Sequence, residues 1–526
     1  MDEERRDRSA PLLEQGGFEY RKRPHRDIFF TVLYSAYMIV MGVIAIYAFV
    51  DRDRPASNQL WKRDYVKDST WCPFTKEANN FTDLTTLRSD YNYGEEIFNW
   101  ADFLQDTWIW IVGSAVGAVI VGIAYLHLVS NFAVVMVYAT ISIGVLVPAA
   151  GGVVMIVLYS EPISGGVLCG LAFIFLVCMC LASRWLNQVG KLIDVAADGV
   201  KYNWELFFFV IIIKVCLLVY LAFLALLGVA AMTDGHFIPN PDRGAREQRG
   251  PECLDSSGDE TVPCCEWKTK DWVRTYWVFL ALLMLWSVFL VFEIKVYVIS
   301  SVISEWYFKE PEGEGSSRLA LANAFGPSFG SLCFASLLLT VVSVVKWCLE
   351  KLKKKDPKNC CIRCLVCMID WMLILLLPIT EFATVRMAIT GEGFIGAGVE
   401  VTEMLARNFL PTFAIWYLPP IVLTFSAILT SLSVSGVIAT IAYHVFKSDL
   451  AQYPHPKNYA GLLLAITFLI IFMVLIFFIA LILNAMNAIY ICFAIDRDSK
   501  CETKSNVHEV MRSVPDIKQM DEEEKV

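Results

Sequence analysis

Charged residues are scarce in this sequence of 526 residues, in which Asp, Glu, Lys and Arg together make up 18%. Soluble globular domains carry about 25% charged residues, so the deficit argues against a soluble protein. The formal net charge of −9 lies mostly in two loops and an acidic C-terminal tail. This charge says nothing about nucleic acid, and no nucleic-acid partner is predicted.

Common catalytic motifs are absent as well. The sequence contains no nucleophile elbow, P-loop or His-Glu-x-x-His pattern. The stretch "GEGFIGAG" at residues 391–398 is rich in glycine, but it follows no predicted strand and so lacks the context of a phosphate-binding loop. We therefore predict no enzymatic activity, no cofactor and no metal site.

Hydrophobic residues are abundant instead, at 56%, and they are gathered in long runs. The runs at residues 207–232 and 461–483 exceed the roughly 20 residues that cross a bilayer core. Because lipid cannot satisfy backbone hydrogen bonds, such runs are expected to be helices. The sequence predicts an all-α polytopic membrane protein with about ten transmembrane helices. The expected spans are residues 28–50, 108–129, 132–158, 163–182, 206–232, 273–299, 328–347, 365–389, 410–445 and 460–493.

The N-terminal tail, residues 1–27, is polar and holds seven Arg and Lys residues. It shows no cleavable signal peptide, so the first apolar run is expected to act as a retained signal anchor. The positive-inside rule places this tail in the cytosol. Two large loops, residues 51–107 and 233–272, then lie on the opposite side of the membrane.

Both of these extracytosolic loops carry features of an oxidising compartment. The first contains the sequence Asn80-Phe81-Thr82, so Asn80 is a candidate glycosylation site. Together the loops hold an even number of cysteines, which suits two disulfide bonds but does not specify the pairing. The disulfide candidates are Cys72, Cys253, Cys264 and Cys265.

Two further segments bear on the predicted topology. Residues 184–203 place apolar side chains at helical spacing and predict an amphipathic helix on the inner leaflet. The stretch "CLEKLKKKDPKNCCIRCLVC", residues 348–367, combines lysines with five cysteines. Alternation of the spans places this stretch outside, whereas its positive charge favours the cytosol. The sequence leaves open whether residues 328–347 and 365–389 fully cross the membrane.

The cysteines of this stretch suit lipid attachment better than metal binding. Four thiols within eight residues, with no His nearby, do not match the tetrahedral ligand set of a structural zinc. Cysteine beside lysine at a membrane edge is typical of palmitoylation, and plain membrane-edge residues are the alternative. The palmitoylation candidates are Cys360, Cys361, Cys364 and Cys367.

Ionisable side chains within the predicted spans are candidate functional residues, because each costs free energy unless it is paired or hydrated. Glu293 in the sixth span is the leading candidate for counter-charge or proton coupling. Lys214 in the fifth span and His127 near the end of the second are further proton-coupling candidates. Lys295 could simply extend its amine to the interface, and His127 could be an ordinary interfacial residue.

The sixth span is also rich in aromatic residues. Trp286 lies near its middle, away from both interfaces, where the indole could hold a quaternary ammonium through a cation–π contact. Helix packing is the alternative explanation for this residue. The candidate substrate-binding residues are Trp286, Glu293, Tyr297, Trp306 and Tyr307.

Seven short motifs, in order along nearly the whole chain, resemble the choline transporter-like family. They are "HRDIFF", "FLQDTWIWIVGS" through Asp106 and Trp108, "GKLIDVAADGV", "SSVISEWYF" through Trp306 and Tyr307, "SFGSLCFASLLLTVV" through Gly330, Ser331, Leu332 and Ser336, "ATVRMAITGEGFIGAGVEVTEMLARN" through Ala383, Ala388, Ile389, Gly391, Phe394, Leu405, Arg407 and Asn408, and "NAIYICFAIDRD" through Ile491, Cys492 and Phe493. Glu293, Lys295 and Arg386 depart from the small or apolar residues of the family pattern. The chain therefore resembles a divergent branch.

The resemblance implies a ten-helix transporter domain over residues 28–493, with cytosolic tails at residues 1–27 and 494–526. It implies facilitated transport of choline, or of the related ethanolamine, by proton exchange. The expected location is the plasma membrane or an endolysosomal membrane, and the oligomeric state is left open. The alternative is a membrane structural or trafficking protein that acts through partner binding, since "RSAPLLEQ" resembles a dileucine sorting signal.

Overall fold

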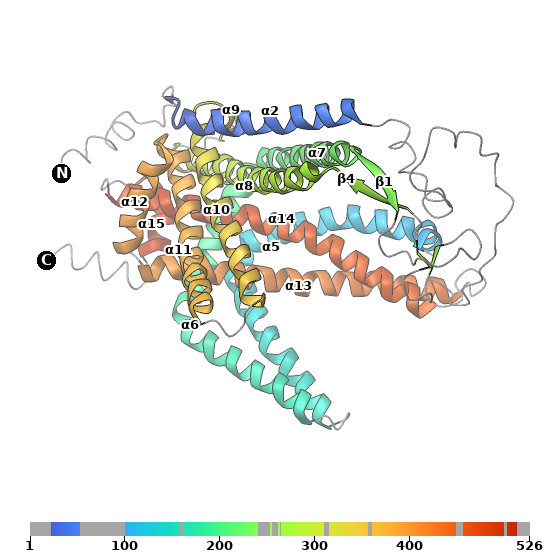
Figure 1. Cartoon of the computed structure of the whole chain (residues 1–526). Coiled ribbons are helices and arrows are strands. Elements are labelled where there is room, and N and C mark those ends of the chain that lie inside the picture. The colour runs from blue at the N-terminus through green and yellow to red at the C-terminus, as the bar shows by residue number, and fades with distance from the viewer. Residues whose placement is uncertain are drawn as a thin grey trace.

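The computed structural model is built almost entirely of long α-helices (Figure 1). It describes residues 23–52, 100–157, 162–239, 253–254, 261–262, 265–309, 315–355, 360–407, 409–448, 456–498 and 502–512. Within these residues, eight helices are long and apolar enough to cross a membrane. The prediction of an all-α polytopic membrane protein is confirmed.

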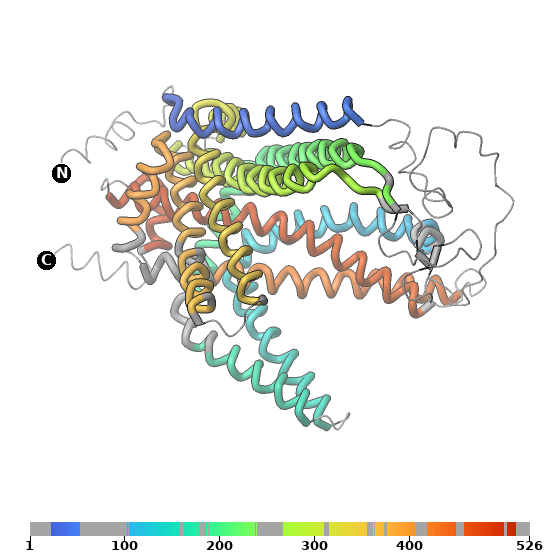
Figure 2. Tube along the Cα trace, in the orientation of Figure 1, coloured from blue at the N-terminus to red at the C-terminus, as the bar shows by residue number. Residues whose placement is uncertain are grey.

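A main bundle is formed by helices that run alongside one another (Figure 2). They are α2 (Ile28–Asp51), the first part of α5 (Trp100–Val157), α7 (Glu205–Met232), α8 (Asp271–Phe308), α13 (Phe409–Ser448) and α14 (Pro456–Asp498). Their contact faces bury apolar side chains such as Ala45, Leu224 and Leu283 completely. Because lipid is as apolar as the core, close packing rather than removal from water holds such helices together.

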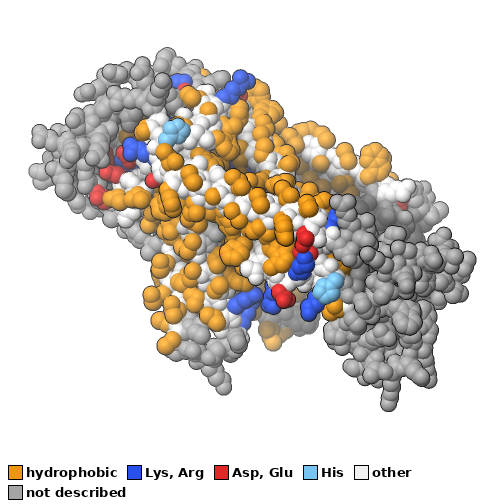
Figure 3. Space-filling view, turned by 45° about the horizontal axis from the view of Figure 1, so that its top comes forward, with side chains coloured by type: hydrophobic (Ala, Val, Ile, Leu, Met, Phe, Trp, Pro, Cys, Tyr) orange, Lys and Arg blue, Asp and Glu red, His pale blue; other side chains and the backbone are white. Residues whose placement is uncertain are grey.

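The outer faces of the bundle are apolar too. Leu218, Val219 and Leu226 on α7 are each 66% exposed, which would be costly in water. In the space-filling view, hydrophobic side chains cover most of the described surface, and charged side chains gather toward its ends (Figure 3). This distribution is the one that a lipid-embedded helix bundle requires.

The predicted count of ten separate spans is not reproduced. The second and third predicted spans form one element, α5, whose helical geometry is interrupted only at Phe132 (φ −137°, ψ 27°). The fourth corresponds to the first part of α6 (Pro162–Tyr202), which is not among the eight helices counted above. The later part of α5 and the start of α6 form a hairpin that leaves the main bundle at an angle (Figure 1).

The amphipathic segment at residues 184–203 continues α6 without a break. Its apolar side chains were expected to face the membrane, but the structure buries them within the protein. Leu186, Val189, Leu192 and Val200 are at most 3% exposed and belong to the main core. The periodicity of the sequence correctly predicted which helix face is buried. It did not predict that other parts of the protein, rather than the membrane, cover this face.

Helices α10 (Phe329–Lys355) and α11 (Cys360–Thr390) contain the two segments whose crossing the sequence left open. Both are long and apolar enough to span a bilayer. In Figure 1 they run crosswise to α2, α7 and α8. Lys346 on α10 forms an ion pair with Asp370 on α11 at 2.9 Å. This ion pair joins the two helices close to the Lys- and Cys-rich stretch, residues 348–367.

Three shorter helices lie toward the end of the bundle where α2 begins and α14 ends (Figure 1). They are α9 (Ser317–Phe325), α12 (Phe394–Arg407) and α15 (Ser505–Arg512). The glycine-rich stretch at residues 391–398 forms the turn into α12 and its first residues. Gly391 has φ +74°, a left-handed conformation that favours glycine and ends α11.

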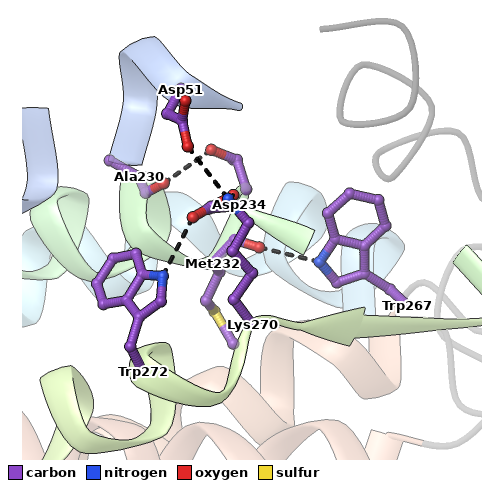
Figure 4. A network of polar contacts seen from close by, with 8 residues as sticks. Asp51, Ala230, Met232, Asp234, Trp267, Lys270 and Trp272 are labelled. Atoms are coloured by element: carbon purple, nitrogen blue, oxygen red, sulfur yellow. Dashed lines mark hydrogen bonds and ion pairs between the residues drawn. The ribbon is translucent and has the colours of Figure 1, made fainter. Parts of the chain in front are cut away.

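At the opposite end, short strands follow α7 within the second predicted loop. Strand β1 (Gly235–Pro239) pairs antiparallel with β4 (Cys265–Thr269), and β2 (Cys253–Leu254) pairs antiparallel with β3 (Thr261–Val262). Figure 4 shows the polar contacts that join this region to the helices: Lys270 lies between Asp51 and Asp234. The indole of Trp272 also donates to Asp234, at 3.2 Å.

Replacing Lys270 should loosen this end of the bundle. Its amine lies 2.8 Å from Asp234, whose side chain is 3% exposed, so Lys270→Gln leaves a buried carboxylate without its cation. Lys270 itself is 45% exposed, and we expect a loss of about 1–2 kcal/mol, measured by thermal unfolding in detergent. Lys268→Gln, at an exposed position on β4 two residues before Lys270, should change little.

The ion pairs with Asp234 and Asp51 hold the pKa of Lys270 above its ordinary value. A raised lysine pKa means that this contribution to stability is complete at neutral pH. It is lost only as the pH rises through the folded-state pKa. An unfolding temperature that responds to Lys270→Gln equally at neutral pH and well above the lysine range would contradict this account.

The segment before α2 packs tightly against the start of α10. The backbone N–H of Arg26 donates to the carbonyl of Pro327 at 3.2 Å, and the hydroxyl of Ser331 donates to Asp27 at 2.5 Å. Gly330 lies directly against this segment, and a Cβ there would overlap the carbonyl oxygens of Arg26 and Asp27. The glycine is therefore required by close approach of two backbones.

Gly330→Ala should displace this segment. The clash is with backbone atoms, which cannot turn away, so we expect a loss of about 1–3 kcal/mol in thermal unfolding. Gly461→Ala on α14 is the matched control, because a Cβ there meets no atom within 4 Å. Equal unfolding temperatures for the two variants would refute the close approach.

Candidate functional site

The candidate site follows one face of α8. Trp286, Leu290, Glu293 and Tyr297 recur at spacings of four, three and four residues, and all are at most 3% exposed. Residues three and four apart share a face of an α-helix. The candidate substrate-binding residues of the sixth span are therefore brought onto one stripe that is buried within the bundle.

Glu293 is completely buried on this stripe. Its Oε2 accepts a hydrogen bond of 2.5 Å from the hydroxyl of Thr384 on α11. Its Oε1 has no hydrogen-bond partner among the described residues. A buried carboxylate with an unused oxygen is costly in the membrane interior, and such groups are typical of ion and proton pathways.

A second acidic residue, Glu381, lies three residues before Thr384 on α11. Its Oε1 accepts a hydrogen bond of 2.9 Å from Asn487 on α14. Lys295 interacts electrostatically with both Glu381 and Glu293. Three helices thus contribute to one polar cluster in the bundle interior, and we call Glu293, Lys295, Glu381, Thr384 and Asn487 the central polar cluster.

Two predicted proton-coupling residues differ in their relation to this cluster. Lys214 on α7 lies within electrostatic range of Lys295, and its amine is 4.6 Å from the ring centre of Phe477. His127 is exposed on α5, and its backbone carbonyl accepts hydrogen bonds from the side chains of Ser130 and Asn131. The geometry brings Lys214 toward the site and gives His127 no part in it.

Trp286 lies two turns from Glu293 in an aromatic group. The ring of Tyr34 meets it edge-on at 5.1 Å, and the ring of Tyr37 lies 6.2 Å away. Its indole N–H donates to the hydroxyl of Ser336 at 3.0 Å and to the carbonyl of Cys333 at 3.2 Å. Trp286 thus joins α2, α8 and α10, and aromatic faces gather at one end of the stripe.

The other aromatic candidates lie toward the opposite end of α8. The hydroxyl of Tyr297 contacts Arg23 at 2.5 Å and Ser328 at 2.9 Å. Tyr307 donates a hydrogen bond of 2.9 Å to Asp496 on α14. The ring of Trp306 lies 3.4 Å from the amine of Lys504. Tyr307 and Trp306 therefore contact the C-terminal part of the chain rather than the central polar cluster.

The predicted modification sites are only partly described. Asn80, Cys72 and Cys264 lie outside the described residues, and the side chains of Cys253, Cys265 and Cys360 are not described. Cys361, Cys364 and Cys367 are exposed in the first turns of α11. Glycosylation, disulfide bonding and palmitoylation stay predictions.

Sequence reasoning missed part of the central polar cluster. Glu381, Thr384 and Asn487 are not among the candidate site residues that the sequence analysis names. Glu381 and Thr384 are three residues apart, so they share a helical face, and this signal was available. The partnership between α8, α11 and α14 depends on tertiary packing and could not be read from local spacing.

Comparison with known proteins places this architecture in a family. The family described as "Plasma-membrane choline transporter" matches residues 166–498, which is more than half of the chain. A CTL-like protein of Dictyostelium discoideum is 21% identical over 451 residues, covering 82% of this chain and 79% of that protein.

Two further relatives align over shorter regions. Choline transporter-like protein 5 of Macaca fascicularis is 24% identical over 238 residues, covering 43% of this chain and 33% of that protein. Protein PNS1 of Saccharomyces cerevisiae is 26% identical over 185 residues, covering 33% of this chain and 34% of that protein. The family match and the helical architecture agree, and the chain belongs to the choline transporter-like family of integral membrane proteins.

Proposed function

We propose that this protein transports choline, or a closely related organic cation such as ethanolamine, through its helix bundle. The observation that carries the proposal is Glu293, a fully buried carboxylate with one oxygen that lacks a hydrogen-bond partner among the described residues. A permanent cation needs a counter-charge inside the membrane, where water cannot supply one. Family membership supports a transporter and leaves the substrate to the chemistry of the site.

The aromatic group around Trp286 supplies the second element of recognition. Quaternary ammonium groups bind to aromatic faces through cation–π contacts, which strengthen when the cation is desolvated. Trp286 and Glu293 are seven residues apart, about 10 Å along the helix axis. Trp286 and Glu293 thus offer a cation two kinds of contact on a single helix face.

Proton exchange follows if Glu293 binds a proton and the cation alternately. The carboxylate cannot hold both charges at once, so arrival of the cation favours release of the proton. Lys295 and Glu381 carry opposite charges near Glu293, and these two charges compensate one another during the exchange. A proton gradient would then drive cation movement in the opposite direction.

The orientation proposed for the bundle has both termini in the cytosol. The seven Arg and Lys residues of the N-terminal tail support this by the positive-inside rule. The strands β1 to β4 and Lys270 would then face the extracytosolic side. The plasma membrane and an endolysosomal membrane both fit this orientation.

Uptake of labelled choline into proteoliposomes tests the proposal. Purified protein should give saturable uptake that increases when the lumen is acidic relative to the outside. Unlabelled ethanolamine should compete if the site recognises the shared aminoethanol group. Uptake equal to that of empty liposomes, with choline and with ethanolamine, would remove the transport proposal.

A further inference from the structure

The guanidinium of Arg23 donates to a tyrosine hydroxyl and to backbone carbonyls at the end of the bundle where α2 begins. One nitrogen, Nη1, donates to the hydroxyl of Tyr297 at 2.5 Å and to the carbonyl of Met387 at 3.4 Å. The other, Nη2, donates to the carbonyl of Ala388 at 2.9 Å. The guanidinium carbon lies 5.9 Å from the ring centre of Tyr297.

The two carbonyls belong to the last turn of α11. Carbonyl groups at a helix C-terminus carry the negative end of the helix dipole and lack partners within the helix. The backbone N–H of Gly391 satisfies the carbonyl of Met387 at 3.0 Å, but the carbonyl oxygens still attract a cation. Tyr297, Met387 and Ala388 are fully buried, so these groups act where water screens them little.

The Arg23 side chain lies against the glycine that ends α11. Gly391 ends α11 at φ +74°, and a Cβ there would come within 3.4 Å of the Arg23 side chain. The Arg26 and Asp27 backbone is held against α10, as described above, so the side chain of Arg23 extends from an anchored segment. Arg23 is therefore a tethered cation with a short reach.

We propose that the Tyr297 ring and the C-terminal carbonyls of α11 form a subsite for a quaternary ammonium cation, which Arg23 occupies as a tethered competitor. An aromatic ring and converging carbonyl oxygens can also bind a quaternary ammonium, which donates no hydrogen bond but presents methyl groups that carry part of its positive charge. Tyr297 follows Glu293 by four residues, about 6 Å along α8. The subsite continues the buried stripe toward the proposed cytosolic end, and this part of the inference rests on the proposed function.

A purely structural role for Arg23 predicts something different. Arginine near a helix C-terminus stabilises the helix by donating to its last carbonyls. Under that explanation, removing Arg23 would lower stability and would not increase affinity for a free cation. Cation affinity therefore separates the two explanations, and stability alone does not.

Equilibrium binding of labelled choline to the purified full-length chain tests the proposal. Arg23→Gln should lower the Kd about tenfold if Arg23 fills the subsite about nine-tenths of the time, because apparent affinity scales with the competent fraction. Arg26→Gln is the matched control: it removes the same charge from the same segment, at an exposed side chain. It should bind choline with the wild-type Kd.

Tyr297 variants keep the test decisive if Arg23→Gln folds poorly. Tyr297→Phe removes the hydroxyl that Arg23 contacts but keeps the ring, so it should also lower the Kd. Combining Tyr297→Leu with Arg23→Gln should abolish the gain in choline affinity that Arg23→Gln gives alone, because the aromatic face is lost. A Kd that is unchanged or higher in both Arg23→Gln and Tyr297→Phe would overturn the proposal and leave Arg23 as a helix cap.

Choline flux measured in parallel separates this inference from the proposed function. If the wild-type protein transports choline but Arg23→Gln does not bind choline more tightly, the role of Arg23 as a tethered competitor is refuted and the transport proposal stands. A gain in binding without flux in any variant would support the subsite and refute transport. Absence of specific choline binding in every variant would refute both.

Discussion

Glu293→Gln is expected to reduce choline flux about a hundredfold, corresponding to roughly 3 kcal/mol. The substitution keeps the size of the side chain, and its amide oxygen can still accept the hydrogen bond from Thr384. It removes the negative charge that would balance the cation in the bundle interior. The remaining flux should no longer respond to a pH gradient, since glutamine cannot exchange a proton.

Glu205→Gln is the matched control for this experiment. Glu205 lies at the exposed start of α7, where water balances its charge. Flux should be unchanged in this variant. If Glu293→Gln transports choline as fast as the wild-type protein does, Glu293 has no role in the transport mechanism.

Asp496→Asn is expected to detach α15 from the bundle. Asp496 is fully buried at the end of α14 and accepts hydrogen bonds from Tyr307, from the hydroxyl and backbone N–H of Thr503, and through Oδ2 contacts His508 at 3.0 Å. An amide offers one acceptor oxygen in place of two, so some of these donors are left unsatisfied.

We expect the change at Asp496 to cost about 3 kcal/mol, the order seen when one partner of a buried charged group is lost. Val507 and Met511 of α15 are each 1% exposed, so its release uncovers an apolar face. Hydrogen exchange of residues 505–512 should accelerate, and trypsin should cleave after Lys504. Asp498→Asn, at an exposed position two residues later, should leave both measurements unchanged.

Protection of α15 that persists in Asp496→Asn would contradict this account. The remaining contacts would then be sufficient, chiefly the amine of Lys504 over the Trp306 ring and the packing of α15 on α6. Tyr307→Phe offers a milder test of the same network. It removes a single donor and should accelerate exchange by less than Asp496→Asn.

The sequence predicted the fold class because lipid imposes a simple rule. Long apolar runs must be helical in a bilayer, and the run around Leu218 cannot be anything else. The rule gives no boundaries between helices that join without a polar loop. It therefore could not tell whether the second and third predicted spans form two helices or one. The structure joins them in α5, with a break in helical geometry only at Phe132.

The candidate site was predictable on α8 and not beyond it. A carboxylate at position 293 inside an apolar run is unusual in any membrane helix, and spacing alone places Trp286 and Tyr297 on the same face. The contact of Arg23 with Tyr297 joins residues 274 positions apart. No local pattern encodes such a contact, because it depends on how the segment before α2 meets α11.

The same limit explains why Trp306 and Tyr307 were grouped with the substrate site. Both are aromatic and lie on the favoured helix, so their composition fits cation binding. The structure shows that they face the C-terminal segment through Lys504 and Asp496. Helical spacing tells which residues share a face but not which partner covers each part of it.

Solute counterflow of choline is the most direct measurement of the central claim. Proteoliposomes are loaded with unlabelled choline and diluted into labelled choline, without a membrane potential or pH gradient. A carrier that binds choline within the bundle should give a transient accumulation of label, absent in Glu293→Gln and present in Glu205→Gln. Wild-type protein that gives no accumulation above empty liposomes would contradict the account.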